Sequence, residues 1–256
     1  MHTLPENILL EKKPWFQSWF DSRFYHLLYK YRDEVEAQAF INRLLQELQP
    51  PPGSLMLDVG CGKGRHSVYL ASKGYTVTGF DLAPSSILEA KKNETQGLQF
   101  FRHDMRVPFA GKKFDYVFNF FTSFGYFKDE EENQKVIDNL SAALKPDGFV
   151  LIDYLNTAYA EEHLVPHEEK EIDGIVYSIH KWTDDDFLYK KIIVRENGSH
   201  VHEYIEHVAK FHLSQFEYFF QKADLKIENL YGDYNLKKYL PKKSRRLILL
   251  AKKGCA

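Results

Sequence analysis

A short glycine-rich stretch carries residues whose types and spacing could do chemistry. Residues 55–66 read Leu-Met-Leu-Asp-Val-Gly-Cys-Gly-Lys-Gly-Arg-His, which predicts a buried strand followed at once by glycines at alternate positions. Residues 65–73 then have helical spacing and stop at Gly74. Such a turn brings bare backbone and the unpaired N–H groups of a helix N-terminus close to a ligand. We therefore expect a ligand site here, positioned by the elements around it.

The glycine spacing differs from that of the common phosphate-binding loops. A dinucleotide fingerprint reads G-x-G-x-x-G, but Arg65 occupies the position of its third glycine. A P-loop reads G-x-x-x-x-G-K-[ST], but Leu57 occupies the position of its first glycine, and Gly64 follows Lys63. Asp58, just before the first glycine, would repel a pyrophosphate and attract an ammonium or sulfonium group. The sequence therefore favours a ligand that carries a positive charge.

The run Asp-x-Gly-x-Gly-x-Gly after a buried strand resembles motif I of the class I S-adenosylmethionine-dependent methyltransferases. Residues 55–156 follow the order of elements in this family, and Leu-Lys-Pro-Asp-Gly-Phe at 144–149 is similar to its Leu-Lys-Pro-Gly-Gly signature. The resemblance implies S-adenosyl-L-methionine as the cofactor and S-adenosyl-L-homocysteine as the product, and we expect no metal. It places these residues of the turn at the cofactor: Asp58, Gly60, Cys61, Gly62, Gly64, Arg65 and His66.

Acidic residues after the next two strands are placed to hold a nucleoside. Asp81 closes a strand at 75–80 and lies 21 residues after Gly60, where an α/β nucleotide fold puts an acid for the ribose hydroxyls. We include its neighbour Leu82 in the cofactor site. Asp104 and Met105 follow a strand at 98–102. The resemblance implies that this Asp takes the adenine amino group and its neighbour packs on the ring, tasks that suit a carboxylate and a thioether.

The strand at 114–121 should lead into the reaction site, because ligands of open α/β sheets bind beyond the carboxyl ends of strands. Asn119 and Phe120 are expected at the cofactor, and Ser123 and Tyr126 beside the substrate. Amino-methylating nucleic-acid enzymes carry Asn/Asp-Pro-Pro-Tyr/Phe at this place. Here Asn119 is followed by Phe-Phe-Thr, which disfavours a nucleic-acid substrate.

The C-terminal part of the chain supplies further substrate-pocket candidates. An amphipathic helix at 129–144 and a turn at 145–148 precede a strand at 149–155. A helix from Gln215 to Ala223, capped by Ser214, precedes strands at 225–231 and 246–251 that would form a hairpin. The candidates are Asn156 at the end of the strand at 149–155, His163 after it, and Arg246, which could bind an anionic group of the substrate.

Two segments outside this alternation should cover the site. Residues 14–31 carry aromatic residues at steps of three and four and predict one helix, with a second at about 34–49. Their pattern resembles the N-terminal lid of small-molecule methyltransferases, in which a Tyr or Arg reaches the methionine carboxylate; the candidates are Tyr25, Tyr29 and Arg32. Period-two alternation at 171–181, 187–196 and 200–213 predicts an inserted antiparallel sheet. His200, His202 and His212 share strand parity there, but no Cys or acid completes a metal-ligand set.

Composition sets the broad class. The 256 residues are 44% hydrophobic and 27% charged with a net charge of −2, which is typical of a globular protein without an electrostatic footprint for nucleic acid. No apolar run approaches the roughly 18 residues that span a bilayer, and the N-terminus does not read as a signal peptide. The two cysteines make no disulfide framework. We therefore expect a cytoplasmic protein with no membrane partner.

These observations predict an α/β fold with a seven-stranded, mostly parallel Rossmann-like sheet, a C-terminal antiparallel hairpin and a small inserted antiparallel β cap. The expected organisation is a helical lid at 1–52, a cofactor-binding domain at 53–156 and 214–256, and the cap at 157–213. The predicted function is methyl transfer to a small-molecule acceptor. An RNA or protein methyltransferase, a nicotinamide oxidoreductase and a non-catalytic cofactor-binding protein remain alternatives. No spacing singles out a general base, an attacking atom or an oligomeric state.

Overall fold

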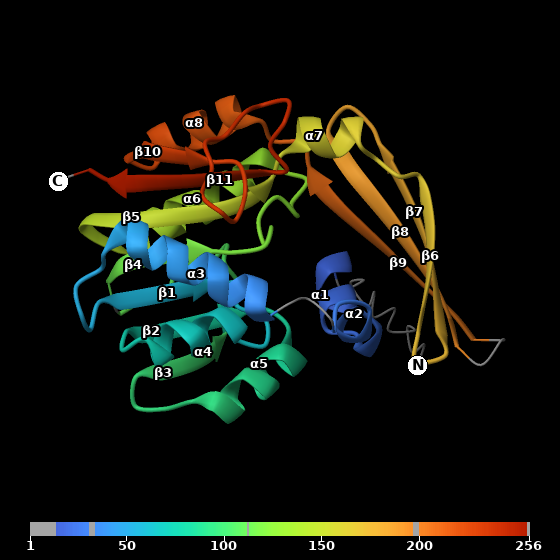
Figure 1. Cartoon of the computed structure of the whole chain (residues 1–256), viewed down its shortest axis with the longest axis horizontal. Helices are drawn as coiled ribbons and strands as arrows, with labels where there is room; N and C mark the ends of the chain where they lie inside the picture. The colour runs from blue at the N-terminus through green and yellow to red at the C-terminus, as the bar shows by residue number, and fades with distance from the viewer. Residues whose placement is uncertain (1–13, 31–33, 112, 197–199, 255–256) are drawn as a thin grey trace, which may run out of the picture.

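Two β-sheets of different kinds organise the chain (Figure 1). The computed structural model describes residues 14–30, 34–111, 113–196 and 200–254. The larger sheet carries the glycine-rich turn, and the smaller sheet stands beside it with helices α1 and α2 lying between the two (Figure 1). Within the described ranges, no helix has both the length and the apolar character needed to cross a bilayer.

The larger sheet has seven strands in the order β10-β11-β5-β4-β1-β2-β3. Neighbouring strands from β5 to β3 pair in parallel, whereas β11 runs antiparallel to both β5 and β10. The predicted Rossmann-like sheet with a C-terminal antiparallel hairpin is thereby confirmed. Its strands are β1 (Leu55–Val59), β2 (Thr76–Asp81), β3 (Leu98–Arg102), β4 (Phe114–Asn119), β5 (Leu144–Leu155), β10 (Leu225–Tyr231) and β11 (Arg246–Lys253).

Helices cover both faces of this sheet, because its central strands carry apolar side chains on both faces and each face must be shielded from water. On one face, Phe40, Leu70 and Ile87 belong to a single buried cluster with strand residues. On the other face, Ile137 and Phe216 do the same. The helices are α3 (Glu34–Leu48), α4 (Arg65–Ser72) and α5 (Pro84–Ala90), which is followed by a 3-10 turn (Lys91–Asn93), on the first face, and α6 (Glu130–Ala143) and α8 (Leu213–Lys222) on the second.

The inserted sheet has four antiparallel strands, in the order β6-β7-β8-β9. The sequence interpretation expected three, because it treated residues 171–181 as one run. That run contains the dipeptide Asp173-Gly174, whose φ angles of 51° and 76° make the tight turn of a hairpin. The elements of this region are α7 (Thr157–Glu162), β6 (His167–Ile172), β7 (Ile175–Thr183), β8 (Phe187–Glu196) and β9 (His200–Ala209).

The expected single helix at 14–31 is wrong within the described residues: two short helices, α1 (Trp15–Phe20) and α2 (Arg23–Leu28), replace it. Ser22 has an extended backbone and its hydroxyl accepts the Tyr25 N–H at 3.1 Å, so it begins a new helix. Both helices pack on the inserted sheet, where Trp19, Phe24 and Leu28 share a buried cluster with residues of β7 and β8. Helix α3 instead covers the larger sheet.

Two smaller differences concern element ends. The turn expected at 145–148 lies within β5, which begins at Leu144 and accommodates Asp147 with a φ of 62°. Helix α8 begins two residues earlier than expected, because the Gln215 side chain accepts the backbone N–H of His212 at 3.0 Å. His212, rather than Ser214, is therefore its N-cap residue.

Substitution of Gly64 should test the packing of α4 on the sheet. Gly64 has a φ of 82°, and a Cβ there would lie 2.5 Å from the Phe100 ring. We expect Gly64→Ala to lower the free energy of unfolding by about 2–4 kcal/mol in urea titration, from backbone strain plus overpacking.

Gly74→Ala is the matched control. Gly74 has a φ of 91°, but a Cβ there would meet nothing within 4 Å. Its substitution should cost only the backbone strain, about 1 kcal/mol. Equal losses of unfolding free energy in the two variants would contradict the packing role of Gly64.

Candidate cofactor and substrate site

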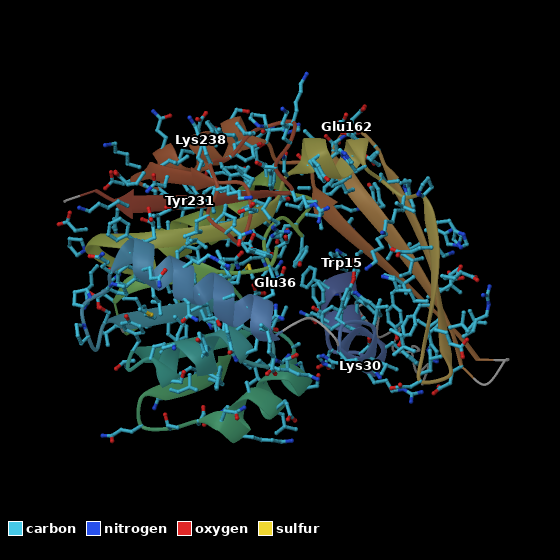
Figure 2. The ribbon with its side chains drawn as sticks, viewed as in Figure 1. Trp15, Lys30, Glu36, Glu162, Tyr231 and Lys238 are labelled. Carbon is cyan, nitrogen blue, oxygen red and sulfur yellow. The ribbon has the colours of Figure 1, made fainter. Side chains whose placement is uncertain are left out.

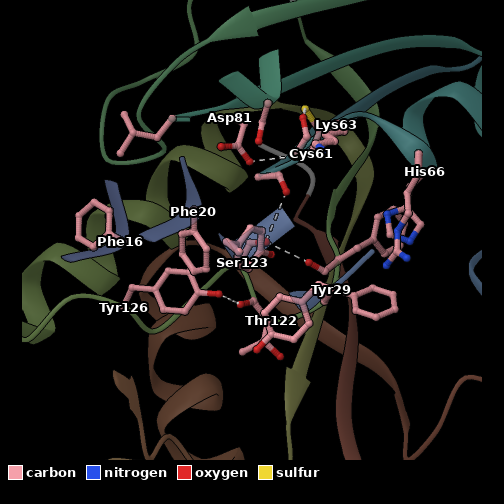
Figure 3. A pocket seen from close by; sticks show the side chains of 18 of the residues that line it. Phe16, Phe20, Tyr29, Cys61, Lys63, His66, Asp81, Thr122, Ser123 and Tyr126 are labelled. Carbon is pink, nitrogen blue, oxygen red and sulfur yellow. Dashed lines mark hydrogen bonds between the residues drawn. The ribbon is translucent and has the colours of Figure 1, made fainter. Parts of the chain in front are cut away.

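A cavity of about 1010 Å³ lies at the carboxyl edge of the larger sheet, under α1, α2 and β9. Figure 3 shows residues from both sides around it, with Asp81 and Lys63 on the sheet side and Phe16, Phe20 and Tyr29 on the helical side. Most of the predicted site residues line it: Tyr25, Gly60, Cys61, Gly62, Arg65, His66, Asp81, Leu82, Asp104, Met105, Phe120, Ser123, Tyr126 and Arg246.

The glycine loop after β1 is shaped for close approach. The N–H groups of Gly60 and Cys61 both donate to the Phe80 carbonyl, at 2.9 and 3.0 Å, which ties the loop to β2. Gly60 has a φ of 71°, and a Cβ there would lie 2.6 Å from Cβ of Ser123. The loop is thus pressed against the turn after β4, and no side chain fits at this point.

Asp58 lies beneath this loop and does not line the cavity. It is buried at the end of β1, where one carboxylate oxygen accepts the Ser67 hydroxyl at 2.5 Å. Burial raises the pKa of Asp58 to about 7, against the opposing effect of the Ser67 hydrogen bond. A cation bound above the loop would favour the ionised form of Asp58, and ionised Asp58 would in turn favour the cation.

Asp81 lies at the end of β2 with its carboxylate on the cavity wall. Its two oxygens accept the backbone N–H groups of Ala83 and Gly62, at 2.8 and 2.9 Å. Burial raises the pKa of this carboxyl above its ordinary value. A carboxylate has about four lone-pair sites, so the observed bonds leave acceptor capacity for two ligand hydroxyls. The residue is therefore suited to a ribose.

Asp104 is engaged by a neighbour that the sequence interpretation did not consider. Arg106 donates to it from its backbone N–H at 2.9 Å and from Nη2 at 2.7 Å, and also pairs with Glu132 at 2.7 Å. Although burial opposes the shift, these bonds and the charge of Arg106 hold the pKa of Asp104 below its usual range. Both Asp104 and Met105 line the cavity. An adenine amino group would thus have to share Asp104 with Arg106.

His66 lines the cavity, but its Nε2 is buried. Its Nε2 finds no hydrogen-bond partner within the described part of the chain. Burial, with the nearby Arg65 charge, lowers the pKa of His66 well below its ordinary value, so the imidazole is neutral at pH 7.

The turn after β4 forms another part of the wall. Phe120, Phe121, Thr122 and Ser123 all line the cavity. Figure 3 shows the Tyr126 hydroxyl directed at Thr122, to whose carbonyl it donates a hydrogen bond. Asn119 lies behind this wall, where its amide donates to the Val59 carbonyl at 2.9 Å.

Aromatic rings from the N-terminal helices close the opposite side. The rings of Phe20, Tyr25 and Tyr126 all line the cavity, and the Phe20 ring lies 5.0 Å from Tyr25 and 5.2 Å from Tyr126. Trp15, on α1 between the two sheets (Figure 2), donates through its indole N–H to Nε2 of His207 at 3.1 Å. This bond attaches α1 to strand β9.

Several predicted residues lie outside the cavity. Asn156 is buried, and its amide donates to the carbonyls of Pro241 and Ser244, both at 2.7 Å. His163 is exposed and stacks on Tyr159 at 3.9 Å. Gly64 packs against Phe100 behind the loop, while Asp58 and Asn119 lie beneath the wall, as described above. Arg32 falls outside the described residues.

Other cavity residues were not predicted from the sequence. Glu206 and Val208 come from β9, and Tyr234 comes from the segment between β10 and β11. No local motif marks them, because only the packing of distant segments brings them to the site. Phe121 and Thr122 could have been found, since both lie between Phe120 and Ser123 in the predicted loop.

Comparison with known proteins shows which domain the chain resembles. Residues 56–148 match the family model described as a methyltransferase domain. An uncharacterized methyltransferase of Synechocystis sp. (strain ATCC 27184 / PCC 6803 / Kazusa) is 36% identical over 111 residues, which cover 43% of this chain and 51% of the relative. The chain spans about half the length of several curated relatives that it matches.

Longer but weaker matches extend beyond this domain. The dTDP-3-amino-3,4,6-trideoxy-alpha-D-glucopyranose N,N-dimethyltransferase of Streptomyces venezuelae is 24% identical over 190 residues, covering 71% of this chain and 79% of the relative. The crystal structure of an S-adenosylmethionine-dependent methyltransferase from Clostridium acetobutylicum ATCC 824 has the same fold, with a TM-score of 0.75 and 21% identity over 90% of this chain and 96% of that one. Residues 56–148 are thus similar to a methyltransferase domain, and the chain shares its fold with an S-adenosylmethionine-dependent methyltransferase.

Proposed function

We propose that the protein transfers a methyl group from S-adenosyl-L-methionine to a small-molecule acceptor bound in the same cavity. The observation that carries this proposal is the convergence of the glycine loop, Asp81 and the turn after β4 on one cavity of about 1010 Å³. A cavity of this size is at the upper end of the usual range for small-molecule sites, which suits a cofactor and an acceptor together.

In this proposal the cofactor is held along the carboxyl edge of the sheet. Asp81 accepts the ribose hydroxyls, and the loop from Gly60 to Gly62 receives the amino-acid part, with Tyr25 reaching it from α2. Leu82 and Met105 supply apolar contacts for the adenine ring, and Asp104 lies beside it.

Bound S-adenosyl-L-methionine would supply an already activated methyl group, so the protein is left to orient the reactants and to exclude water. The aromatic residues of α1, α2 and the segment around Tyr126 are placed to exclude water from one side. No side chain is assigned as a general base. His26 is a poor one at pH 7, because burial and then Lys63 lower its pKa to about 4.

Three basic side chains around the cavity are already paired with carboxylates, which favours a small acceptor over a polynucleotide. Arg246 pairs with Asp153 at 2.6 Å, Arg106 with Asp104 at 2.7 Å, and Lys190 behind the wall with Glu206 at 3.4 Å. Cations that are already neutralised in this way give little attraction for phosphates, which dominate nucleic-acid affinity. The amine of a nucleotide-linked sugar is the acceptor class to test first, by analogy with the Streptomyces venezuelae relative.

Calorimetric titration with S-adenosyl-L-homocysteine tests the cofactor assignment. The native protein should bind it, and Asp81→Asn should weaken binding by at least about tenfold, because hydrogen bonds to a charged group contribute about 1.5–3 kcal/mol. Asp184→Asn is the matched control, since Asp184 also accepts two backbone N–H groups, from Asp186 and Phe187, but lies on the inserted sheet. A folded native protein that binds no S-adenosyl-L-homocysteine would refute the proposal.

The raised pKa of Asp58 predicts a pH dependence of cofactor binding. A bound cation lowers the pKa of Asp58 from about 7, so binding releases a proton and tightens as the pH rises from 6 to 8. If bound cofactor lowers the pKa of Asp58 by about 1, the affinity for S-adenosyl-L-methionine would rise by up to about tenfold over this pH range. The amine of the ligand contributes its own pH dependence to binding in both proteins. Comparison of the native protein with Asp58→Asn therefore isolates the contribution of Asp58. Identical pH profiles for the two proteins would contradict the role of Asp58.

A further inference from the structure

The turn after β4 contains two successive residues in a conformation that they rarely adopt. Phe121 and Thr122 have φ angles of 58° and 57°. This left-handed region is unfavourable for residues other than glycine, and most of all for a β-branched residue such as Thr. Two such residues in succession persist only where the surrounding structure holds them. Both line the cavity, so whatever holds them also shapes the site.

Asp153 of β5 holds the backbone of this turn. Its side chain is fully buried, and Oδ2 accepts the Phe121 N–H at 2.9 Å. Its backbone carbonyl accepts the Thr122 N–H at 2.9 Å. One residue thus accepts the N–H groups of both strained positions.

Arg246 of β11 completes the arrangement from the next strand. Its Nε donates to Oδ1 of Asp153 at 2.7 Å, and its Nη2 donates to the Thr122 hydroxyl at 2.8 Å. The Tyr234 hydroxyl donates to Oδ2 of Asp153 at 3.0 Å. The buried carboxylate is therefore paired and hydrogen-bonded, as a charge in that environment must be.

The far side of the turn rests on the glycine loop. The Ser123 hydroxyl donates to the Gly60 carbonyl at 3.4 Å, and there is no room for a Cβ on Gly60 beside it. The Arg65 guanidinium lies 4.2 Å from the centre of the Phe121 ring. A displacement of the turn would therefore be transmitted to the loop proposed to hold the cofactor.

We propose that Asp153 and Arg246 are positioning residues, which hold the turn at Phe121–Thr122 in its strained form and thereby set the position of the glycine loop. This inference rests on the proposed function only for the identity of the ligand. The expectation that Arg246 binds an anionic substrate group stays a prediction beside this one, since Asp153 and Thr122 engage only Nε and Nη2 of its guanidinium.

The test uses two readouts on Asp153→Asn, with Arg246→Lys and Tyr234→Phe as milder variants. The first is amide hydrogen exchange at Phe121 and Thr122 in the ligand-free protein, followed by NMR. It should accelerate by about tenfold or more at Phe121, whose acceptor is the substituted carboxylate, and less at Thr122, whose acceptor is the unchanged backbone carbonyl of Asp153. The second is the Kd for S-adenosyl-L-homocysteine, which should rise by about tenfold, because the glycine loop would no longer be held in its binding position. A merely structural loss of stability would leave the Kd of the folded protein unchanged.

Asp115→Asn is the matched control. Asp115 also accepts one backbone N–H, from Leu55 at 2.8 Å, and pairs with one basic side chain, Lys145 at 2.8 Å, but it does not line the cavity. Its substitution should change neither readout. Thr122→Gly in the Asp153→Asn background should recover at least about threefold in Kd, because glycine adopts a positive φ without strain.

The outcomes are distinct. Unchanged exchange and an unchanged Kd in folded Asp153→Asn would overturn the proposal, as would a failure of glycine to recover any affinity. If Asp153→Asn does not fold, Arg246→Lys and Tyr234→Phe decide by the same criteria. A native protein that binds no S-adenosyl-L-homocysteine would refute the cofactor assignment, and the exchange data, which need no ligand, would still decide whether Asp153 holds the turn.

Discussion

The parallel pairing of β1 with β2 and with β4 is the constraint on which the site depends. Since all three strands run in the same direction, their carboxyl ends meet at one edge of the sheet. The glycine loop, Asp81 and the turn at Phe121–Thr122 each follow one of these ends, so they come together without any direct sequence relation. Hydrogen bonds from the N–H groups of Gly60 and Cys61 to the Phe80 carbonyl, and from the Gly62 N–H to Asp81, then attach the glycine loop to the end of β2.

Two of the buried or partly buried carboxylates around the cavity are paired with guanidinium groups. Asp153 with Arg246, and Asp104 with Arg106, place a carboxylate and a guanidinium within 2.7 Å of each other. Removal of either partner would leave an uncompensated charge in a poorly solvated place, which is strongly unfavourable. These pairs also anchor backbone: Asp153 accepts the Phe121 N–H, and Asp104 accepts the Arg106 N–H. Electrostatics and loop shape are thus coupled at this site.

The cavity is completed by segments that are far apart in the chain. Helices α1 and α2 precede the larger sheet in sequence, yet their apolar faces are buried against the inserted strands β7 and β8. The hydrogen bond between Trp15 and His207 makes α1 part of the same unit as β9. The N-terminal helices and the inserted sheet therefore form one cover over the site, and Glu206 and Val208 reach the cavity from it.

By itself, the sequence determined the strand–glycine–helix turn, the position of Asp81 at the end of the next strand, and the seven-stranded sheet. Each of these depends on residues that are neighbours or that repeat with a fixed period. Only the tertiary structure decided which side chains face the cavity. Asn156 and His163 point elsewhere, Arg106 engages Asp104, and Tyr234 and Glu206 enter from distant segments. The physical reason is that the direction of a side chain and its partner are set by packing between elements, which no local pattern of residues encodes.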